Sequence, residues 1–315
     1  MTLEKGAKGE EVRSIQEALN FLHFQGRISA SSSADFQPLE TDGIFGNDTE
    51  DAVTRFQEDR GLYTDGRVGL VTIEALQAAL SSRNLELSAP LVLPTDNKLT
   101  IATRSGDKYG DGYDRIRLRS DVMIAFDQVC DEVHKHGGLI TSSGGIRDLY
   151  FKVGPNQSAT SFHYSGRAHD LMIYSGMMKP DTDPYVVERL GDRRYRVYAR
   201  CAAKSAASGA LPPSTTVRNV VTHKSRVKGV SVTDHLLDLT AVFEKHGFRP
   251  IRARKAFEGG GDYLGAEWWH FQYEVGLIRG VTTFGSELSK LYSEAKLKPS
   301  PPWKYRDYIF GKDWN

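Results

Sequence analysis

Residues 161–170 read SFHYSGRAHD, and this stretch decides the fold that we expect for the larger part of the chain. Gly166 permits a turn that other residues resist. The residues that follow it, 167–173, alternate as a β-strand does, so Asp170 and His169 point to opposite faces. We therefore expect Asp170 to face a site next to the turn, and His169 to point away from that site.

Much later in the chain, residues 267–270 read EWWH, and the two stretches together offer the groups of a hydrolytic zinc site. Such a site holds the ion with three nitrogen or oxygen ligands and leaves a fourth position open for water. The ion lowers the pKa of that water to about 7, and a carboxylate that does not bind the metal accepts the proton. We predict a Zn²⁺ site whose ligands are His163, Asp170 and His270. Glu267 is the predicted general base.

The spacing in the second stretch requires a bend in the backbone. Glu267 and His270 lie three residues apart, which puts their side chains on opposite faces of a straight strand. Both can reach one metal ion only if the chain bends near Trp268. Trp268 and Trp269 would then wall the pocket against bulk water, and we expect Trp268 to contact the substrate.

The pattern Ser-x-His-x-x-Gly-x-Ala-x-Asp followed by Glu-x-Trp-His resembles the zinc D-Ala-D-Ala carboxypeptidases and dipeptidases. These enzymes belong to the group named after lysostaphin, D-Ala-D-Ala metallopeptidases and hedgehog. The resemblance implies the metal and base roles given above. It also implies that Arg147, in the segment SSGGIR (142–147), holds a developing oxyanion. It places Ser161 near the substrate, although Ser161 could also simply cap a turn.

Residues 1–80 are expected to form a small three-helix unit. The spacing of apolar residues predicts a first helix over 11–24. The turns DGIFG (42–46) and DGRVG (65–69) precede two further helices. Both turns, with the residues after them, resemble the small peptidoglycan-binding domain. The resemblance implies a module that docks the chain on cell-wall glycan or stem peptide; the alternative is a spacer or a pro-segment.

The remaining chain is predicted to be a linker at 81–98, rich in Ser, Asn and Pro, and a catalytic domain at 99–315. Helices and strands mix there without a βαβ rhythm, so we expect an α+β fold. In it, a central antiparallel sheet carries the metal ligands and helices pack on one side. The predicted helices are 121–136, 232–246 and 284–297; the predicted strands are 139–143, 185–190, 195–200, 251–257 and 268–273.

The two metal stretches lie further apart than in compact members of the resembled group, which indicates an insertion at about 180–250. Its predicted hairpin carries several arginines, among them Arg189, Arg193, Arg194, Arg196 and Arg200. These arginines would form a solvated basic surface or would meet the carboxylates of stem peptides.

Composition excludes several classes of protein. A length of 315 residues suggests two domains, and a net charge of +1 argues against a dedicated nucleic-acid binder. No apolar run approaches the roughly 18 residues of a membrane span. The first residues lack the apolar core of a secretory signal, so the export route of a secreted, periplasmic or wall-bound protein stays open. Cys130 and Cys201 are expected to be free buried thiols, with one disulfide as the alternative.

These features favour a monomeric zinc peptidase that acts on peptidoglycan, with a D-Ala-D-Ala carboxypeptidase as the first expectation. One alternative is an endopeptidase that cuts the L-Ala-D-Glu bond, as phage endolysins with similar motifs do. Another is a non-catalytic wall-binding protein that keeps the fold and the metal; the presence of Glu267 argues against it.

Overall fold

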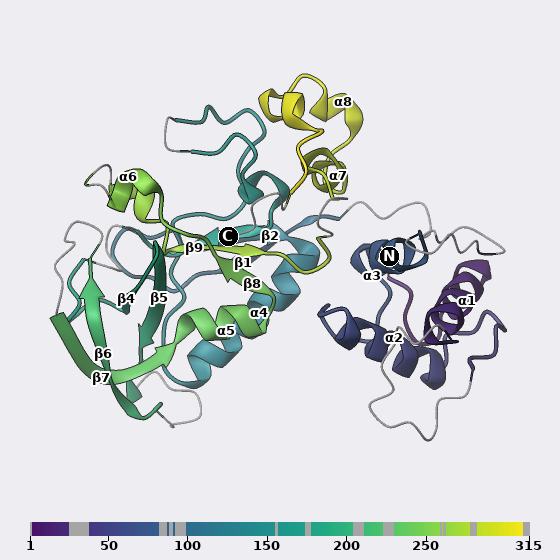
Figure 1. Cartoon of the computed structure of the whole chain (residues 1–315), viewed down its shortest axis with the longest axis horizontal. Coiled ribbons are helices and arrows are strands. Elements are labelled where there is room, and N and C mark those ends of the chain that lie inside the picture. Colours follow the sequence, from purple (N-terminus) through teal and green to yellow (C-terminus); the bar gives the residue numbers. More distant parts are fainter. Residues whose placement is uncertain are drawn as a thin grey trace. The chain divides into compact units, whose positions relative to one another are not determined.

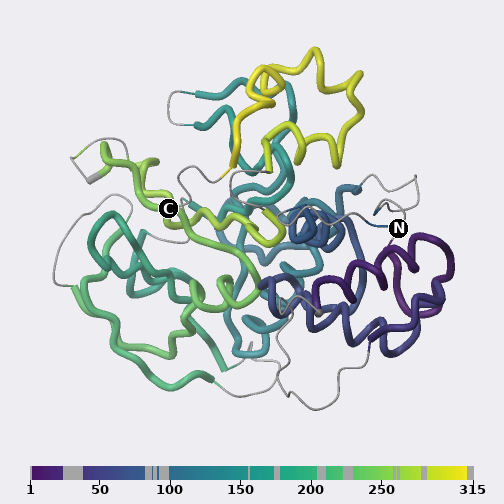
Figure 2. Tube along the Cα trace, turned by 45° about the vertical axis from the view of Figure 1, so that its right-hand side comes forward, coloured from purple at the N-terminus to yellow at the C-terminus, as the bar shows by residue number. Residues whose placement is uncertain are grey.

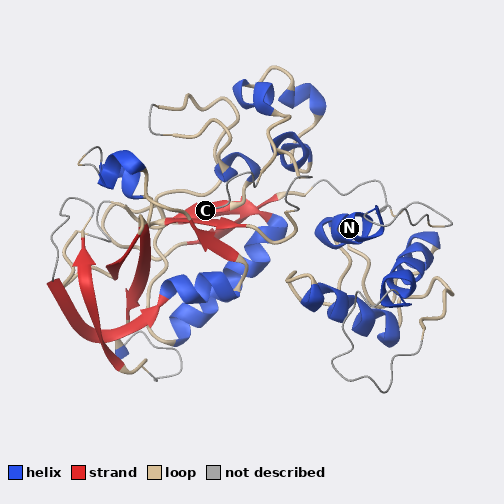
Figure 3. Ribbon diagram, viewed as in Figure 1, coloured by secondary structure: helices blue, strands red, loops and turns tan. Residues whose placement is uncertain are grey.

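The computed structural model describes residues 2–24, 38–81, 87, 91, 99–154, 157–173, 178–203, 211–222, 230–258, 260, 263–277 and 282–310. The chain divides into two compact units (Figure 1). One comprises Met1–Lys98 with Val275–Val281, and the other comprises Leu99–Glu274 with Thr282–Asn315. Helices and antiparallel sheets are both present (Figure 3), which confirms the α+β class. Most of the predicted linker lies outside the described residues, and so do residues 25–37.

The first unit contains three helices, as predicted. They are α1 (Glu10–Phe24), α2 (Asn47–Asp59) and α3 (Leu70–Ser81). Their apolar faces meet in one core, in which Ile15, Leu19, Val53, Phe56 and Leu76 are fully buried. The helically spaced apolar residues of the three helices therefore form one shared core. Figure 2 shows these helices at the purple and blue end of the chain.

The two turns of this unit are closed by the same set of hydrogen bonds. In each turn a buried glutamine donates to the Asp side chain and to the backbone oxygen two residues further on, and its own oxygen accepts from the Gly N–H. The two sets are Gln16 with Asp42, Gly43 and Ile44, and Gln57 with Asp65, Gly66 and Arg67. Both glycines have positive φ, +73° and +67°, which is why glycine occupies this position. The sequence repeat is therefore a structural repeat.

A three-stranded antiparallel sheet lies at the centre of the second unit. Its strands, in the order in which they pair, are β3 (Ala168–Asp170), β9 (His270–Tyr273) and β8 (Phe248–Pro250). Helices α4 (Ser120–Lys135) and α5 (Leu239–Lys245) pack beside it (Figure 1). The Phe126 ring of α4 lies 4.6 Å from the His169 ring and 6.0 Å from the Phe248 ring. One face of the sheet is therefore covered by helix, and the face that carries Asp170 is left for a site.

A second pair of strands precedes α4. β1 (Ile101–Ser105) and β2 (Arg115–Arg119) form a two-stranded antiparallel sheet.

None of the helices in the described part of the chain has the length and apolar character that crossing a bilayer requires. Cys130 and Cys201 are both buried and free, as expected, and burial raises the pKa of the Cys130 thiol to about 12.

The insertion folds as a small closed barrel of four antiparallel strands. Its strands are β4 (Tyr185–Gly191), β5 (Arg194–Arg200), β6 (Ser214–Val221) and β7 (Val230–Asp238), arranged in the order β4-β5-β7-β6. Buried valines and a leucine fill it: Val186, Val217, Val220, Val232 and Leu236. The predicted hairpin is confirmed as β4 and β5. Residues 204–210 of the insertion lie outside the described residues.

The helix predicted at 232–246 is wrong over its first half. Val232 and Leu236 are buried in the barrel, because β7 pairs with both β6 and β5. Asp238 ends this strand, and its side chain accepts a hydrogen bond from Ala241 N at 2.9 Å. Only α5 is helical. The apolar spacing that predicted a single helix therefore spans two elements, most of β7 and then α5.

The strand predicted at 139–143 is also wrong. Side chains bind the backbone groups that a neighbouring strand would bind. Asp107 Oδ2 accepts from Ile140 N at 2.6 Å, and Tyr185 Oη accepts from Thr141 N at 2.8 Å. An isolated bridge between Gly144, which follows the segment, and Asp170 connects the chain to the sheet.

Two further predicted elements differ. At 251–257 the chain forms a loop and then α6 (Lys255–Glu258), because the backbone of Ala253 and Arg254 bonds to Arg193 and Gly265 in place of a strand. The predicted C-terminal helix is divided into α7 (Phe284–Ser289) and α8 (Glu294–Leu297). Among the described residues of this unit are also the short 3-10 turns η1 (Phe162–Ser165), η3 (Tyr263–Ala266) and η4 (Pro301–Tyr305).

Candidate metal centre

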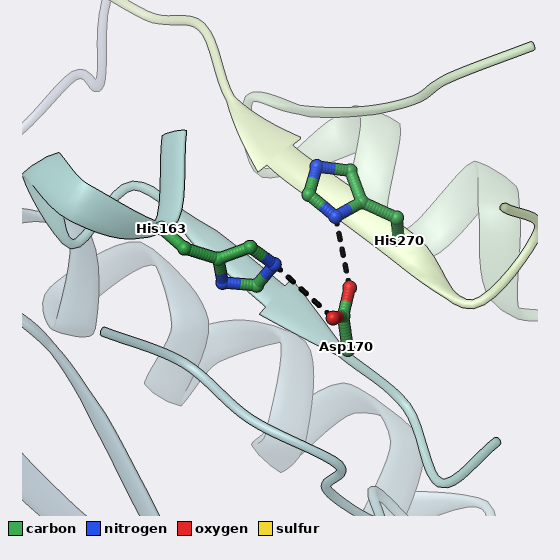
Figure 4. Close-up of side chains that lie close together, drawn as sticks. All are labelled: His163, Asp170 and His270. Carbon is green, nitrogen blue, oxygen red and sulfur yellow. Dashed lines mark hydrogen bonds and ion pairs between the residues drawn. The ribbon is translucent and has the colours of Figure 1, made fainter. Parts of the chain in front are cut away.

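The side chains of His163, Asp170 and His270 converge on one point (Figure 4). Their candidate ligand atoms all lie within 4.8 Å of one another. His163 Nε2 lies 3.1 Å from Asp170 Oδ2, and His270 Nδ1 lies 2.8 Å from Asp170 Oδ1. The structure therefore brings together the three predicted ligands, which come from distant parts of the chain.

Backbone pairing explains why these residues meet. Asp170 of β3 lies directly opposite His270 of β9 in the antiparallel register. His163 comes from η1, which ends at Gly166 in the left-handed conformation with φ +67°. A Cβ atom on Gly166 would lie 2.8 Å from the backbone nitrogen of Arg119. Glycine is thus required at this turn both for its conformation and for its lack of a side chain, and the turn brings His163 back over β3.

Each imidazole is held by a second group. His163 Nδ1 donates to the carbonyl oxygen of Gly145 at 2.5 Å, which leaves Nε2 free to bind a metal ion. The side chain of Gln272 bonds to His270, and Gln272 Nε2 in turn donates to Glu274 Oε1 at 2.7 Å. Metal-binding histidines are commonly oriented in this way through their other ring nitrogen.

Charge in the cluster favours the ionised carboxylate. Burial alone would raise the pKa of Asp170, but the two neighbouring imidazoles hold that pKa well below its usual range. Burial alone would lower the pKa of His270, but Asp170 raises it. The cluster is thus a partly buried anion flanked by two ring nitrogens, which is a donor set that can receive a cation.

The donor set fits Zn²⁺. A tetrahedral zinc site with ligand distances of about 2.0–2.2 Å separates neighbouring ligand atoms by roughly 3.3 Å. Each imidazole nitrogen lies near a different carboxylate oxygen of Asp170, at 3.1 and 2.8 Å, and one ligand atom from each of the three side chains lies within 4.8 Å of the other two. Two nitrogens and one oxygen, with one side open to a cavity, are a set of protein ligands typical of catalytic zinc.

His169 lies on the opposite face, as predicted. Its Nε2 donates to the carbonyl oxygen of Thr141 at 3.0 Å, and burial lowers its pKa to about 4. The ring is fully buried beside Phe126. The neighbour of a candidate ligand is therefore a neutral residue of the core.

A cavity of about 600 Å³, here called the metal cavity, opens on the three candidate ligands. Glu267 also lines it. Glu267 has φ +56°, and its carbonyl oxygen accepts from His270 N at 3.0 Å. The predicted bend is confirmed: it begins at Glu267 and brings Glu267 and His270 to one cavity. A residue other than glycine in this backbone conformation is strained, and such strain is common at functional sites.

Trp268 does not line the metal cavity, so the prediction that both tryptophans wall the pocket is wrong for Trp268. It is 2% exposed, and its ring packs 4.9 Å from Tyr195 and 5.5 Å from Phe257. Trp269 lines the cavity instead. The turn that starts at Glu267 directs the Trp268 side chain into the core and the Trp269 side chain to the cavity wall.

Arg147 and Ser161 both line the metal cavity. The Arg147 guanidinium lies 5.3 Å from the centre of the Tyr164 ring and 5.5 Å from that of Phe151. These two rings hold the cation at the cavity without neutralising it. Ser161 caps η1 by accepting from His163 N at 3.3 Å, so its capping role is present in the structure.

Two further arginines of the metal cavity, Arg252 and Arg254, were not identified from the sequence. Arg254 Nε donates to Glu267 Oε1 at 2.8 Å. No local pattern marks these arginines, because their positions depend on the loop after β8 and on the turn at Glu267. Gln272 was also missed, although its place two residues after His270 in a strand was a usable signal.

Comparison with known proteins concerns the first unit. The family model described as "Putative peptidoglycan binding domain" matches residues 8–76, a range that covers most of the three-helix core. No curated protein matches the chain. The chain therefore carries a peptidoglycan-binding domain at its N-terminus, and this domain associates it with peptidoglycan and the cell wall.

Proposed function

We propose that this protein is a zinc-dependent peptidase that hydrolyses a bond in the stem peptides of peptidoglycan. The observation that carries the proposal is the convergence of His163, Asp170 and His270 beside Glu267 in one cavity. The peptidoglycan-binding domain on the same chain supports the choice of substrate.

Zn²⁺ held by those three side chains would polarise the scissile carbonyl and supply water with a pKa near 7. Glu267 is the base in this proposal. Its Oε1 bonds to Arg254, so the other carboxylate oxygen, Oε2, accepts the proton of the attacking water and delivers it to the leaving amine. Arg147 faces the same cavity and stabilises the negative charge that develops on the substrate oxygen. Trp269 forms part of the cavity wall and limits access of bulk water.

The D-Ala-D-Ala bond is the first candidate for cleavage, because the sequence resembles carboxypeptidases of that specificity. Release of a terminal residue requires a cation for its carboxylate, and Arg252 and Arg254 line the metal cavity. The second candidate is cleavage of the L-Ala-D-Glu bond. A second hollow that shares Ile251 and Arg252 with the metal cavity favours this alternative, because it offers room for a longer peptide.

A digest of purified muropeptides, analysed by mass spectrometry, tests the proposal. Carboxypeptidase action removes one alanine from each pentapeptide stem, whereas endopeptidase action releases most of the stem. Addition of a chelator should stop either reaction, and addition of Zn²⁺ should restore it. A full-length, zinc-loaded protein that binds sacculi but releases no product would contradict the proposal.

A further inference from the structure

A second hollow of about 420 Å³ lies next to the metal cavity and shares Ile251 and Arg252 with it. Its lining includes four arginines: Arg194, Arg196, Arg249 and Arg252. We name this hollow the arginine groove. We propose that the arginine groove binds a carboxylate of the peptide whose scissile bond lies at the metal centre, an inference that rests on the proposed peptidase function.

The arginine groove forms where the insertion meets the central sheet. Arg194 and Arg196 belong to strand β5 of the barrel, Arg249 belongs to β8, and Arg252 follows β8. In the register, Arg249 lies opposite Gln272 of β9, two residues from the candidate ligand His270. A peptide in the metal cavity can therefore extend towards the barrel without leaving the protein surface.

The arginines keep donors that the described residues do not use. Arg196 pairs with Asp238 at 2.9 Å and Arg252 with Asp192 at 3.1 Å, in each case through one terminal nitrogen. The Nε–H groups of both arginines are buried, and neither has an acceptor among the described residues. A buried donor without an acceptor is costly, so each of these two guanidinium groups keeps hydrogen-bonding capacity that the described residues leave unused.

The balance of charge points to an anion. Arg194 is exposed and makes no ion pair with any described residue. Arg249 reaches Glu244 only at 3.6 Å. The lining contains two glutamates, Glu244 and Glu274. Arg196 and Arg252 are paired with Asp238 and Asp192, which leaves Arg194 as the lining cation without an ion pair to any described residue. Guanidinium groups present parallel N–H donors that match a carboxylate, and a partly buried groove screens such pairs less than open solvent does. A carboxylate is therefore the group that the groove fits.

Binding to a full-length Glu267→Gln protein loaded with Zn²⁺ tests this inference, since that substitution should prevent turnover. The probes are two synthetic stem pentapeptides that differ only at D-Glu, whose α-carboxylate is free in one and amidated in the other. Calorimetry should show that the free carboxylate binds about tenfold tighter, the effect of one charge-assisted contact. Added Arg194→Gln or Arg252→Gln should reduce this preference to about twofold or less.

Arg115→Gln is the matched control, because Arg115 is exposed on β2 and lines neither hollow; it should retain the full preference. Equal binding of the two peptides by the Glu267→Gln protein, or a preference that survives both groove substitutions, would overturn the inference. Turnover by the protein with Glu267 intact is measured separately. A preference without turnover would refute the peptidase and keep the groove, whereas turnover without a preference would do the reverse.

Discussion

Arg254 donates from Nε to Oε1 of Glu267 at 2.8 Å, so the candidate base is held by a cation at the edge of the metal cavity. The two residues lie 13 positions apart in the chain, so no local sequence pattern predicts that they pair. In the proposed mechanism the pair fixes one carboxylate oxygen of Glu267 and leaves the other for proton transfer. Arg254 would then be a positioning residue for the base.

Replacement of Arg254 by Gln should lower kcat by about tenfold or more, because a carboxylate that is free to rotate spends less time in the reactive geometry. KM should change less than kcat, and Arg254→Lys should recover part of the loss. Steady-state kinetics on a stem peptide measures this split. A change confined to KM would show that Arg254 binds substrate and does not orient Glu267.

Replacement of Glu267 itself by Gln should leave zinc in place and reduce hydrolysis by about a hundred- to ten-thousand-fold, the usual contribution of a general base. Elemental analysis and single-turnover kinetics on the same sample provide the two measurements. Undiminished turnover by the Gln protein would exclude Glu267 as the base.

Replacement of His163 by Ala should abolish zinc binding, because it removes one of three protein ligands from the cluster. Elemental analysis after dialysis should find no stoichiometric zinc. His134→Ala is the control: His134 bonds to Asp107 at 2.7 Å and lines neither the metal cavity nor the arginine groove. Full zinc content in the His163→Ala protein would show that the ion is held elsewhere.

Replacement of Gln272 by Leu should weaken zinc affinity by about ten- to a hundred-fold, since it removes the group that orients His270. Competition with a chromogenic chelator measures the change. Glu274→Gln should have a smaller effect, because an amide oxygen can still accept the hydrogen bond from Gln272. Unchanged affinity in the Leu protein would mean that His270 is oriented by its backbone alone.

Acid should destabilise the second unit through Glu287. This carboxylate is fully buried and bonds to Arg119, Arg167 and Lys290. Burial alone would raise the pKa of Glu287, but the three cations hold it well below its usual value of 4.5. Because the folded pKa is depressed, the stabilisation is complete above about pH 4.5 and is lost as the pH falls towards the folded pKa.

Glu287→Gln should cost roughly 3–5 kcal/mol of unfolding free energy at neutral pH, because it leaves buried cations with one anion fewer. It should also make stability less dependent on pH below about 4.5. Urea unfolding of both proteins from pH 7 to pH 3 checks the two effects. Parallel stability curves for the parent and the Gln protein would assign the acid sensitivity to other groups.

Much of the metal centre could be predicted because its residues follow local rules. Strand alternation separated Asp170 from His169, and the three-residue spacing of Glu267 and His270 required the bend that the structure shows. Gly166 marked the turn that returns His163 to the strand. In each case the deciding feature lies within a few residues of the chain.

The remaining features depend on partners that are distant in sequence. Residues 232–236 have apolar spacing that suits a helix, yet pairing with two other strands in the barrel made them a strand. Glu267 adopts the left-handed conformation although it is not a glycine, so the sequence does not signal this conformation. Because of it, Trp269 lines the cavity and Trp268 does not. The positions of Arg252 and Arg254 depend on ion pairs with Asp192 and Glu267. Local sequence patterns do not predict these pairs.

The duplicated turn of the N-terminal domain gives this protein a built-in comparison. Gln16 and Gln57 perform the same task in two surroundings of one small fold. The same deletion of an amide at either position removes identical chemistry. Any difference between the two losses of unfolding free energy must therefore come from what surrounds each turn. A single protein can thus show how much the surroundings alone change the stabilisation that a hydrogen-bonded turn provides.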